Sequence, residues 1–142
     1  MRFLIVGLGS IGRRHLRNLR ALGEQDILLF RTHRATLPDE DLDGLPVFTD
    51  LHQALAEKPD GVIIANPTAA HLSSALPAAR AGANLLIEKP VSHTLEGLDA
   101  LKEALALNQA PRQRHADDTG AAGRSCDGEV RKIGQTVGEE AL

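Results

Sequence analysis

Four short apolar runs recur along the chain, at residues 3–6, 27–30, 62–65 and 85–87. They are continuous rather than alternating, which is typical of strands buried on both faces of a parallel sheet. A shorter run at 46–48 follows an acidic loop at 39–44 and predicts a further strand beside the first ones. The pattern therefore predicts a parallel sheet with a buried centre.

The segments between these runs have helical periodicity. We expect helices at 11–22, 50–57, 70–81 and 94–107. In the first helix the apolar face collects Ile11, His15, Leu16, Leu19 and Leu22, and the opposite face carries Arg13, Arg17 and Arg20. Alternating strands and helices form right-handed βαβ units, so we expect an α/β fold with a doubly wound, Rossmann-type parallel sheet over residues 1–107.

The chain changes character at residue 108. The stretch 108–142 is rich in glycine and charge, and its large aliphatic residues are Val130, Ile133, Val137 and Leu142. Glycine inside a helix costs about 1 kcal/mol relative to alanine, so the helical spacing of these residues is a weak signal. We expect this tail to be disordered and to lie outside the domain.

Composition narrows the class of protein. A chain of 142 residues supports one domain with a real core, and its net charge of −3 gives no drive toward nucleic acid or an anionic membrane. No apolar run approaches the roughly 20 residues of a membrane helix. Cys126 is the single cysteine, so no internal disulfide can form. We expect a cytoplasmic protein without a metal site.

The first apolar run leads directly into a G-x-G-x-x-G turn, which predicts a dinucleotide on a helix N-terminus. Gly7 permits the tight turn, Gly9 lets the backbone approach a pyrophosphate, and Gly12 lets the helix pack on the strand. Ser10 and Ile11 open that helix, where free N–H groups and the positive dipole end favour phosphate. The alternative is a structural turn without a ligand.

The end of the second strand indicates which dinucleotide binds. Where NAD-binding folds place an acidic residue for the adenosine ribose, this chain has Arg31, Thr32 and Arg34. Forked, positively charged donors suit a 2′-phosphate, so we predict NADP in preference to NAD, unless these are ordinary solvated residues. Arg13 can likewise face the bound anion, or belong to a solvent-facing basic stripe with Arg17.

Two further motifs lie at strand ends. Asn66, Pro67 and Thr68 follow the 62–65 strand, at the edge where an open α/β sheet binds its ligand, and His71 can reach the same crevice. The same three residues also suit a turn in which Thr68 caps the next helix. Glu88, Lys89 and Pro90 follow the 85–87 strand; a lysine there can polarise a carbonyl, or simply terminate the strand in solvent.

These three motifs together resemble the N-terminal domain of the Gfo/Idh/MocA oxidoreductases, named after glucose-fructose oxidoreductase and inositol dehydrogenase. The resemblance covers about residues 1–107 and rests on the glycine turn followed by His15, on Asn66–His71 and on Glu88–Pro90. It implies that Lys89 is catalytic or positions the substrate, that Glu88 lies near the nicotinamide ribose, and that sugars or polyols are the substrate class.

The chain also departs from this family. Members continue into a further strand, an aromatic- and arginine-rich segment and a large α+β domain whose D-x-x-x-H pattern serves proton transfer. Here Asp117 and Asp118 follow His115, the reverse order, and the chain has no Trp or Tyr. We expect a dinucleotide-binding fragment, not catalytic by itself, whose tail results from a frameshift or early stop. The alternative is an NADP-dependent dehydrogenase completed by a partner chain.

The same departure bears on association. A sheet without the family's final strand ends at the 85–87 strand, whose unpaired backbone groups then form an exposed edge. Such an edge invites pairing with another chain, and the missing cover leaves apolar surface. We therefore expect that the chain can associate with itself through this edge.

Overall fold

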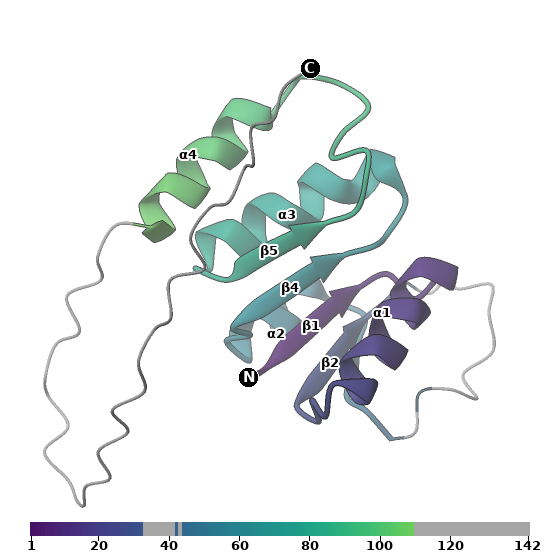
Figure 1. Ribbon diagram of the computed structural model, residues 1–142. Helices are drawn as coiled ribbons and strands as arrows, with labels where there is room; N and C mark the ends of the chain where they lie inside the picture. Colours follow the sequence, from purple (N-terminus) through teal and green to yellow (C-terminus); the bar gives the residue numbers. More distant parts are fainter. Residues whose placement is uncertain (33–41, 43, 110–142) are drawn as a thin grey trace, which may run out of the picture. The chain divides into compact units, whose positions relative to one another are not determined.

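The computed structural model describes residues 1–32, 42 and 44–109, and within these it forms one parallel sheet with helices on both faces (Figure 1). The strands lie in the order β3-β2-β1-β4-β5. Their bounds are β1 (Phe3–Val6), β2 (Ile27–Phe30), β3 (Val47–Phe48), β4 (Gly61–Ile64) and β5 (Asn84–Ile87). The chain reverses direction across the sheet between β1 and β4, so the expected doubly wound Rossmann architecture is confirmed.

The three central strands have the burial that their apolar runs predict. In β1 the last three residues are buried, in β2 the first three, and in β4 all of them. The strands are also level with one another, since Val6 pairs with both Phe30 and Ile64, and Ile64 pairs with Ile87. Their carboxyl ends therefore meet along one edge of the sheet.

The prediction that β5 is buried on both faces is wrong. Its residues alternate between exposed and half-buried, and the side chain of Leu86 is 48% exposed. Among the described residues β5 pairs with β4 alone, so it is an edge strand. Its apolar composition predicted a strand correctly but carried no information about what covers it.

The helices follow the expected order with shifted ends. Their bounds are α1 (Ser10–Ala21), α2 (Leu51–Ala56), the 3-10 turn η1 (Thr68–Ala70), α3 (His71–Arg80) and α4 (Leu98–Gln109). The helix expected from residue 94 begins later because Gly97 adopts a left-handed backbone conformation, with φ of +82°. Leu95 consequently lies outside the helix and is 86% exposed. The remainder of the tail, 110–142, lies outside the described residues.

Two apolar clusters lie on opposite faces of the sheet. In Figure 1, α1 lies in front of the sheet, and α2 and α3 lie behind it. The cluster behind the sheet includes residues of α2, α3 and α4, such as Leu55, Ala78 and Leu101. The cluster in front contains residues of α1, β1, β2 and β4, such as Leu16, Leu29 and Ile63. The front face thus has less helical cover than the back.

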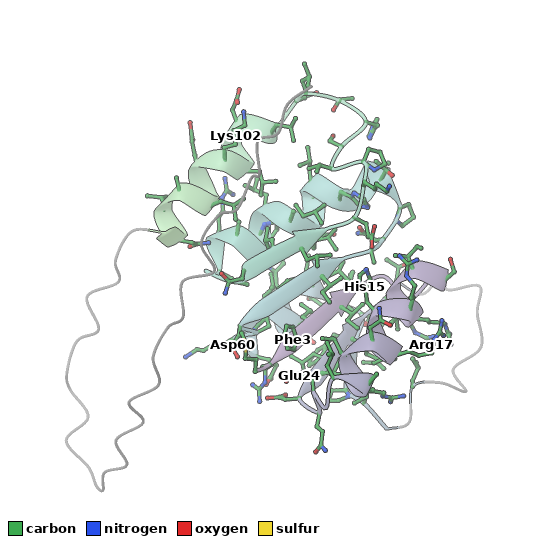
Figure 2. All side chains as sticks on the ribbon, viewed as in Figure 1. Phe3, His15, Arg17, Glu24, Asp60 and Lys102 are labelled. Atoms are coloured by element: carbon green, nitrogen blue, oxygen red, sulfur yellow. The ribbon has the colours of Figure 1, made fainter. Side chains whose placement is uncertain are left out.

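That difference leaves an open, mostly apolar groove in front of β4 and β5. Its walls come from the inner side of α1 and from the two strands. Among its lining residues are Phe3, Leu19, Ile63 and Leu86. Figure 2 shows Phe3 at the start of β1, at the end of the sheet opposite the strands' carboxyl ends. The groove therefore lies on the front face of the sheet beside α1, and not among the turns at the carboxyl ends of the strands.

The first helix is oriented differently from its sequence pattern. Leu22, expected on the buried face, is 79% exposed, and Arg13, expected on the basic face, is only 7% exposed. Figure 2 shows His15 on the side of α1 toward the sheet and Arg17 on the side away from it. A solvent-facing basic stripe therefore does not include Arg13, although Arg17 and Arg14 are exposed.

Candidate functional site

The turns that follow four strands share the carboxyl edge of the sheet. They contain the glycine turn after β1, Arg31 and Thr32 after β2, Asn66–Thr68 after β4, and Glu88–Pro90 after β5. Because the strand ends are level, these turns lie together at the edge where the strand order reverses. Open α/β sheets bind their ligands in a crevice outside the strand ends at this point. Arg34, also predicted to contact the cofactor, lies outside the described residues.

Two glycines of the first turn are required by close packing. Gly7 has a φ of +95°, and a Cβ there would lie 2.6 Å from the backbone Cα and N of Asn66. A Cβ on Gly12 would lie 1.8 Å from the carbonyl oxygen of Gly7. The turn is thus pressed against the end of β4 on one side and against its own helix on the other. Any larger residue at either position would displace backbone.

Gly9 differs from the other two glycines because space is open beside it. A Cβ at Gly9 would meet no atom within 4 Å, and the residue is the N-cap of α1, in an extended conformation. No side chain caps the helix, and its first turn contains no acidic residue. The exposed residues Ser10 and Ile11 follow. The N-terminus of α1 therefore offers backbone N–H groups and a positive dipole end to an anion.

The buried Arg13 stabilises the glycine turn through a hydrogen bond to its backbone. Its Nε donates a hydrogen bond to the carbonyl oxygen of Leu8, at 3.2 Å. That carbonyl lies between the first two glycines of the motif, so the guanidinium ties the first helical turn to the loop that precedes it. The positive charge also lies close to the helix N-terminus, where a bound anion would offset the unfavourable interaction with the helix dipole.

The segment after β4 is held by side-chain hydrogen bonds. Asn66 donates from Nδ2 to the Oγ of Ser74 at 2.9 Å and to the carbonyl oxygen of Ala70 at 3.3 Å. Its Oδ1 is buried and has no hydrogen-bond partner among the described residues. The alternative interpretation, in which Thr68 caps the next helix, is wrong, since neither η1 nor α3 has a side-chain cap. Pro67 is exposed and Thr68 half-buried at the crevice edge.

His71 lies deeper than the sequence suggests. Its side chain is 2% exposed, and its two ring nitrogens lie 2.7 Å from the carbonyl oxygen of Asn66 and 3.0 Å from that of Pro90. Each ring nitrogen therefore faces a backbone carbonyl oxygen of the protein. His71 is thus buried between the turns that follow β4 and β5, and its contact with a cofactor stays a prediction.

Glu88 forms an interaction that the sequence did not reveal. Its Oε1 lies 2.6 Å from Nε2 of His15 and 3.9 Å from Nη2 of Arg14, both on α1. The hydrogen bond with His15 is the main reason that the pKa of Glu88 is lower than its ordinary value, while desolvation opposes the shift. A carboxylate held in this way remains charged at neutral pH.

Lys89 follows directly, with an exposed side chain. Its backbone N–H donates to the Glu88 carboxylate.

Both residues of the His15–Glu88 contact belong to motifs that the sequence shows, because His15 follows the glycine turn and Glu88 opens the last motif. Since 73 residues separate them, the sequence alone did not indicate that they meet.

Two other classes of site find no support among the described residues. No helix in that part of the chain is long and apolar enough to cross a membrane. The same residues include no group of three or more His, Cys, Asp or Glu side chains arranged to hold a metal ion.

The parallel sheet, its reversal point and the glycine turn on α1 define a dinucleotide-binding domain of Rossmann type. A family model described as an oxidoreductase family with an NAD-binding Rossmann fold matches residues 1–112. The chain therefore belongs to the Gfo/Idh/MocA oxidoreductase family, through its NAD-binding domain. The match extends five residues past the expected domain end at 107, and α4 itself continues to Gln109.

Solved structures with the same fold include sugar-nucleotide dehydrogenases. UDP-N-acetylglucosamine 3-dehydrogenase GnnA from Acidithiobacillus ferrooxidans is 30% identical, with a TM-score of 0.64 over 76% of this chain and 34% of its own. The WlbA (WbpB) dehydrogenase from Thermus thermophilus, solved with NAD and alpha-ketoglutarate, is 29% identical, with a TM-score of 0.63 over 76% of this chain and 38% of its own.

A third structure, the WlbA dehydrogenase from Bordetella pertussis in complex with NADH and UDP-GlcNAcA, is 25% identical, with a TM-score of 0.66 over 75% of this chain and 34% of its own. No curated protein sequence matches the chain. The chain spans about a third of the length of the solved relatives. Their likeness thus covers the cofactor domain of a nicotinamide-dependent oxidoreductase.

Proposed function

We propose that the carboxyl edge of this sheet binds a nicotinamide dinucleotide, with NADPH preferred over NADH. The observation that carries the proposal is the uncapped N-terminus of α1, reached through the open space beside Gly9. A pyrophosphate there would accept hydrogen bonds from backbone N–H groups of the first turn and meet the positive end of the helix dipole. Gly7 then brings the turn close to the end of β4, and Gly12 lets the helix pack against the turn.

The remaining candidate contacts follow from their places along the crevice. Arg31 and Thr32 lie where the adenosine ribose is bound in this fold, and Asn66, Pro67 and Thr68 lie across the reversal point from the glycine turn. Ser10, Ile11 and Arg13 complete the phosphate side. Glu88, held by His15, would accept hydrogen bonds from ribose hydroxyls, because its carboxylate is kept charged.

The bound dinucleotide would supply hydride transfer, which no side chain of the protein can provide. Lys89 is the residue to which we assign a catalytic role beside it. Its exposed ammonium group can donate a hydrogen bond to a carbonyl oxygen of a substrate and stabilise negative charge that develops there. We propose sugars or polyols as the substrate class, in agreement with the sugar-nucleotide dehydrogenases among the solved relatives.

We propose further that the domain alone binds cofactor without turnover. Hydride transfer requires a substrate held about 3–3.5 Å from the reacting carbon, and the described residues form one side of such a cleft. The test is to titrate the purified chain with NADPH and NADH, following cofactor fluorescence, and to assay it with a panel of sugars and polyols. Binding without oxidation supports the proposal, whereas steady dehydrogenase activity contradicts it.

The cofactor preference has a separate test at Arg31. Replacing its positive charge in Arg31→Asp removes a partner for the 2′-phosphate and adds an acceptor for ribose hydroxyls. The ratio of the NADPH to the NADH dissociation constants should rise, so that NADH becomes the better ligand. An Arg17→Asp variant, altered on the exposed side of α1, is the control for net charge. An unchanged ratio in Arg31→Asp would remove Arg31 from the site.

The second candidate function is a dehydrogenase completed by another polypeptide. The observation that favours it is the apolar groove beside the β5 edge, where Leu86 is 48% exposed. Unpaired backbone groups and exposed aliphatic side chains together suit an added strand or packed element, including a second copy of this chain. Light scattering on the purified chain distinguishes a monomer from a self-associated form, and restored turnover with a candidate partner would favour this function.

A further inference from the structure

One carboxylate joins α1 to the turn that follows β5. Oε1 of Glu88 lies 2.6 Å from Nε2 of His15 and 3.9 Å from Nη2 of Arg14. In the sheet, β4 lies between β5 and β1, the strand that leads into α1, so β1 and β5 do not pair with each other. Side chains rather than sheet hydrogen bonds therefore connect the turn after β5 directly to α1.

The hydrogen bond between His15 and Glu88 does not depend on the charge of the ring. An ionised carboxylate can only accept a hydrogen bond, so Nε2 of His15 carries the proton. A neutral imidazole with its single proton on Nε2 makes this bond, and a charged ring makes the same bond. The pKa of Glu88 is lowered mainly by this contact, which keeps the acceptor ionised at neutral pH. Hydrogen bonds to a charged acceptor are roughly twice as strong as neutral ones.

The surroundings of this pair favour a lasting contact. The side chains of His15 and Glu88 are only 17% and 24% exposed, so water competes little for the bond. The backbone N–H of Glu88 donates to the carbonyl oxygen of Ile64 at 3.0 Å, and its carboxylate also accepts from the backbone N–H of Lys89. Glu88 is thus held by β4 through its backbone and by α1 through its side chain, whereas the side chain of Lys89 beside it is exposed.

We propose that His15 is a positioning residue that holds the Glu88–Lys89 turn at a fixed separation from the N-terminus of α1. His15 lies in the second turn of the helix that begins at Ser10. The pyrophosphate and the nicotinamide riboside of a dinucleotide are joined covalently, so the protein must keep the two segments that bind them at a matching separation. The inference rests on the proposed function, in which α1 binds the pyrophosphate and Lys89 acts beside the nicotinamide. A carboxylate has about four acceptor positions, so the bond to His15 leaves others for the ribose.

Two ligands separate positioning of the turn from general support of the helix. ADP carries the adenosine and the pyrophosphate of the dinucleotide but no nicotinamide riboside. In His15→Leu the dissociation constant of NADPH should rise about tenfold, the low end of the loss expected for one hydrogen bond to a charged group, and that of ADP should stay within about twofold of the wild type. A residue that only stabilises α1 would weaken both ligands alike. Isothermal titration calorimetry on the full chain measures both constants.

Matched variants identify the hydrogen bond itself. His15→Gln restores an N–H donor, so it should recover most of the NADPH affinity that His15→Leu loses. Asn18 is exposed and lines the apolar groove further along α1, so Asn18→Leu controls for an added leucine on this helix and should bind both ligands as the wild type does. In a Glu88→Ala background, His15→Leu should change the affinity for NADPH by less than about twofold, because the bond is already absent.

The possible outcomes are distinguishable. If the wild-type chain binds NADPH and His15→Leu binds it equally well, or loses affinity for NADPH and ADP to the same degree, the positioning role is wrong and the proposed function stands. If the wild-type chain binds neither NADPH nor NADH, the proposed function is wrong and the positioning role falls with it.

NMR tests the contact without any cofactor. In the full chain labelled with ¹⁵N at histidine, two-bond ¹H–¹⁵N correlations distinguish protonated from unprotonated ring nitrogens, and the His15→Gln variant identifies the His15 signals by their loss. We expect a proton on Nε2 of His15 at neutral pH, in a neutral or a charged ring. An unprotonated Nε2 in the folded chain would overturn the proposal, even if His15→Leu did not fold.

Discussion

Replacing Gly9 by threonine should separate the stability of this domain from its ability to bind cofactor. Gly9 is the N-cap of α1, with φ of −70° and ψ of −171°, a conformation that capping threonines adopt. Its added Cβ would meet no atom within 4 Å. The hydroxyl can accept a hydrogen bond from an N–H group of the first turn. We therefore expect the free energy of unfolding to stay within a few tenths of a kcal/mol of the wild type, or to rise slightly.

Cofactor binding should respond in the opposite direction. The threonine side chain would occupy the space through which we propose that the pyrophosphate approaches, and its hydroxyl would compete for the same N–H groups. Loss of one hydrogen bond to a charged phosphate costs about 1.5–3 kcal/mol. The dissociation constant of NADPH in Gly9→Thr should then rise roughly 10- to 150-fold.

The assay pairs urea unfolding, followed by circular dichroism, with a fluorescence titration of NADPH. The control is Asp50→Ala, which removes a real helix cap, because Asp50 accepts a hydrogen bond from the backbone N–H of His52 at 2.8 Å. That variant should lose about 1 kcal/mol of stability and retain its affinity for NADPH. Wild-type affinity in a folded Gly9→Thr protein would refute a pyrophosphate site at the N-terminus of α1.

Three further predictions concern packing, acid stability and association. Gly12→Ala should lower the free energy of unfolding by about 1–3 kcal/mol or more, measured in urea, because its Cβ would lie 1.8 Å from a backbone oxygen; equal stability would contradict the close packing. Glu88→Gln should narrow the stability gap to wild type as the pH falls. The pKa of Glu88 in the folded chain is lowered from a usual value of about 4.3. The carboxylate's contribution to the free energy of unfolding is therefore complete above that pH and is lost as the pH falls through the lower, folded pKa. A stability difference between wild type and Glu88→Gln that does not change with pH down to about 2 would argue against the His15 contact. If the chain self-associates through β5, Leu86→Glu should shift it toward monomer in light scattering, whereas an exposed control, Lys102→Glu, should not.

The sequence by itself determined the strands of the sheet and the turn at its centre. The runs at 3–6 and 27–30 match β1 and β2 residue for residue, and β4 begins one residue before its predicted start. These agreements have a common cause, because a strand buried on both faces must be apolar at every position and therefore leaves an unbroken signal. The three glycines were equally informative, since their spacing reflects steric needs of one local turn.

Tertiary structure decided what covers each element and which distant side chains meet. The apolar run of β5 resembles the others, but an edge position leaves Leu86 exposed, and no local pattern reports a missing neighbour. Arg13 is buried because its guanidinium finds the carbonyl of Leu8, a contact that a helical wheel ignores. Likewise, His15 meets Glu88, and His71 meets the carbonyl of Pro90, only because parallel crossovers return the chain to the same edge. The residues of the site could be predicted from the sequence, but only the tertiary structure decides which of them are exposed at the strand ends and which are buried beneath the turns.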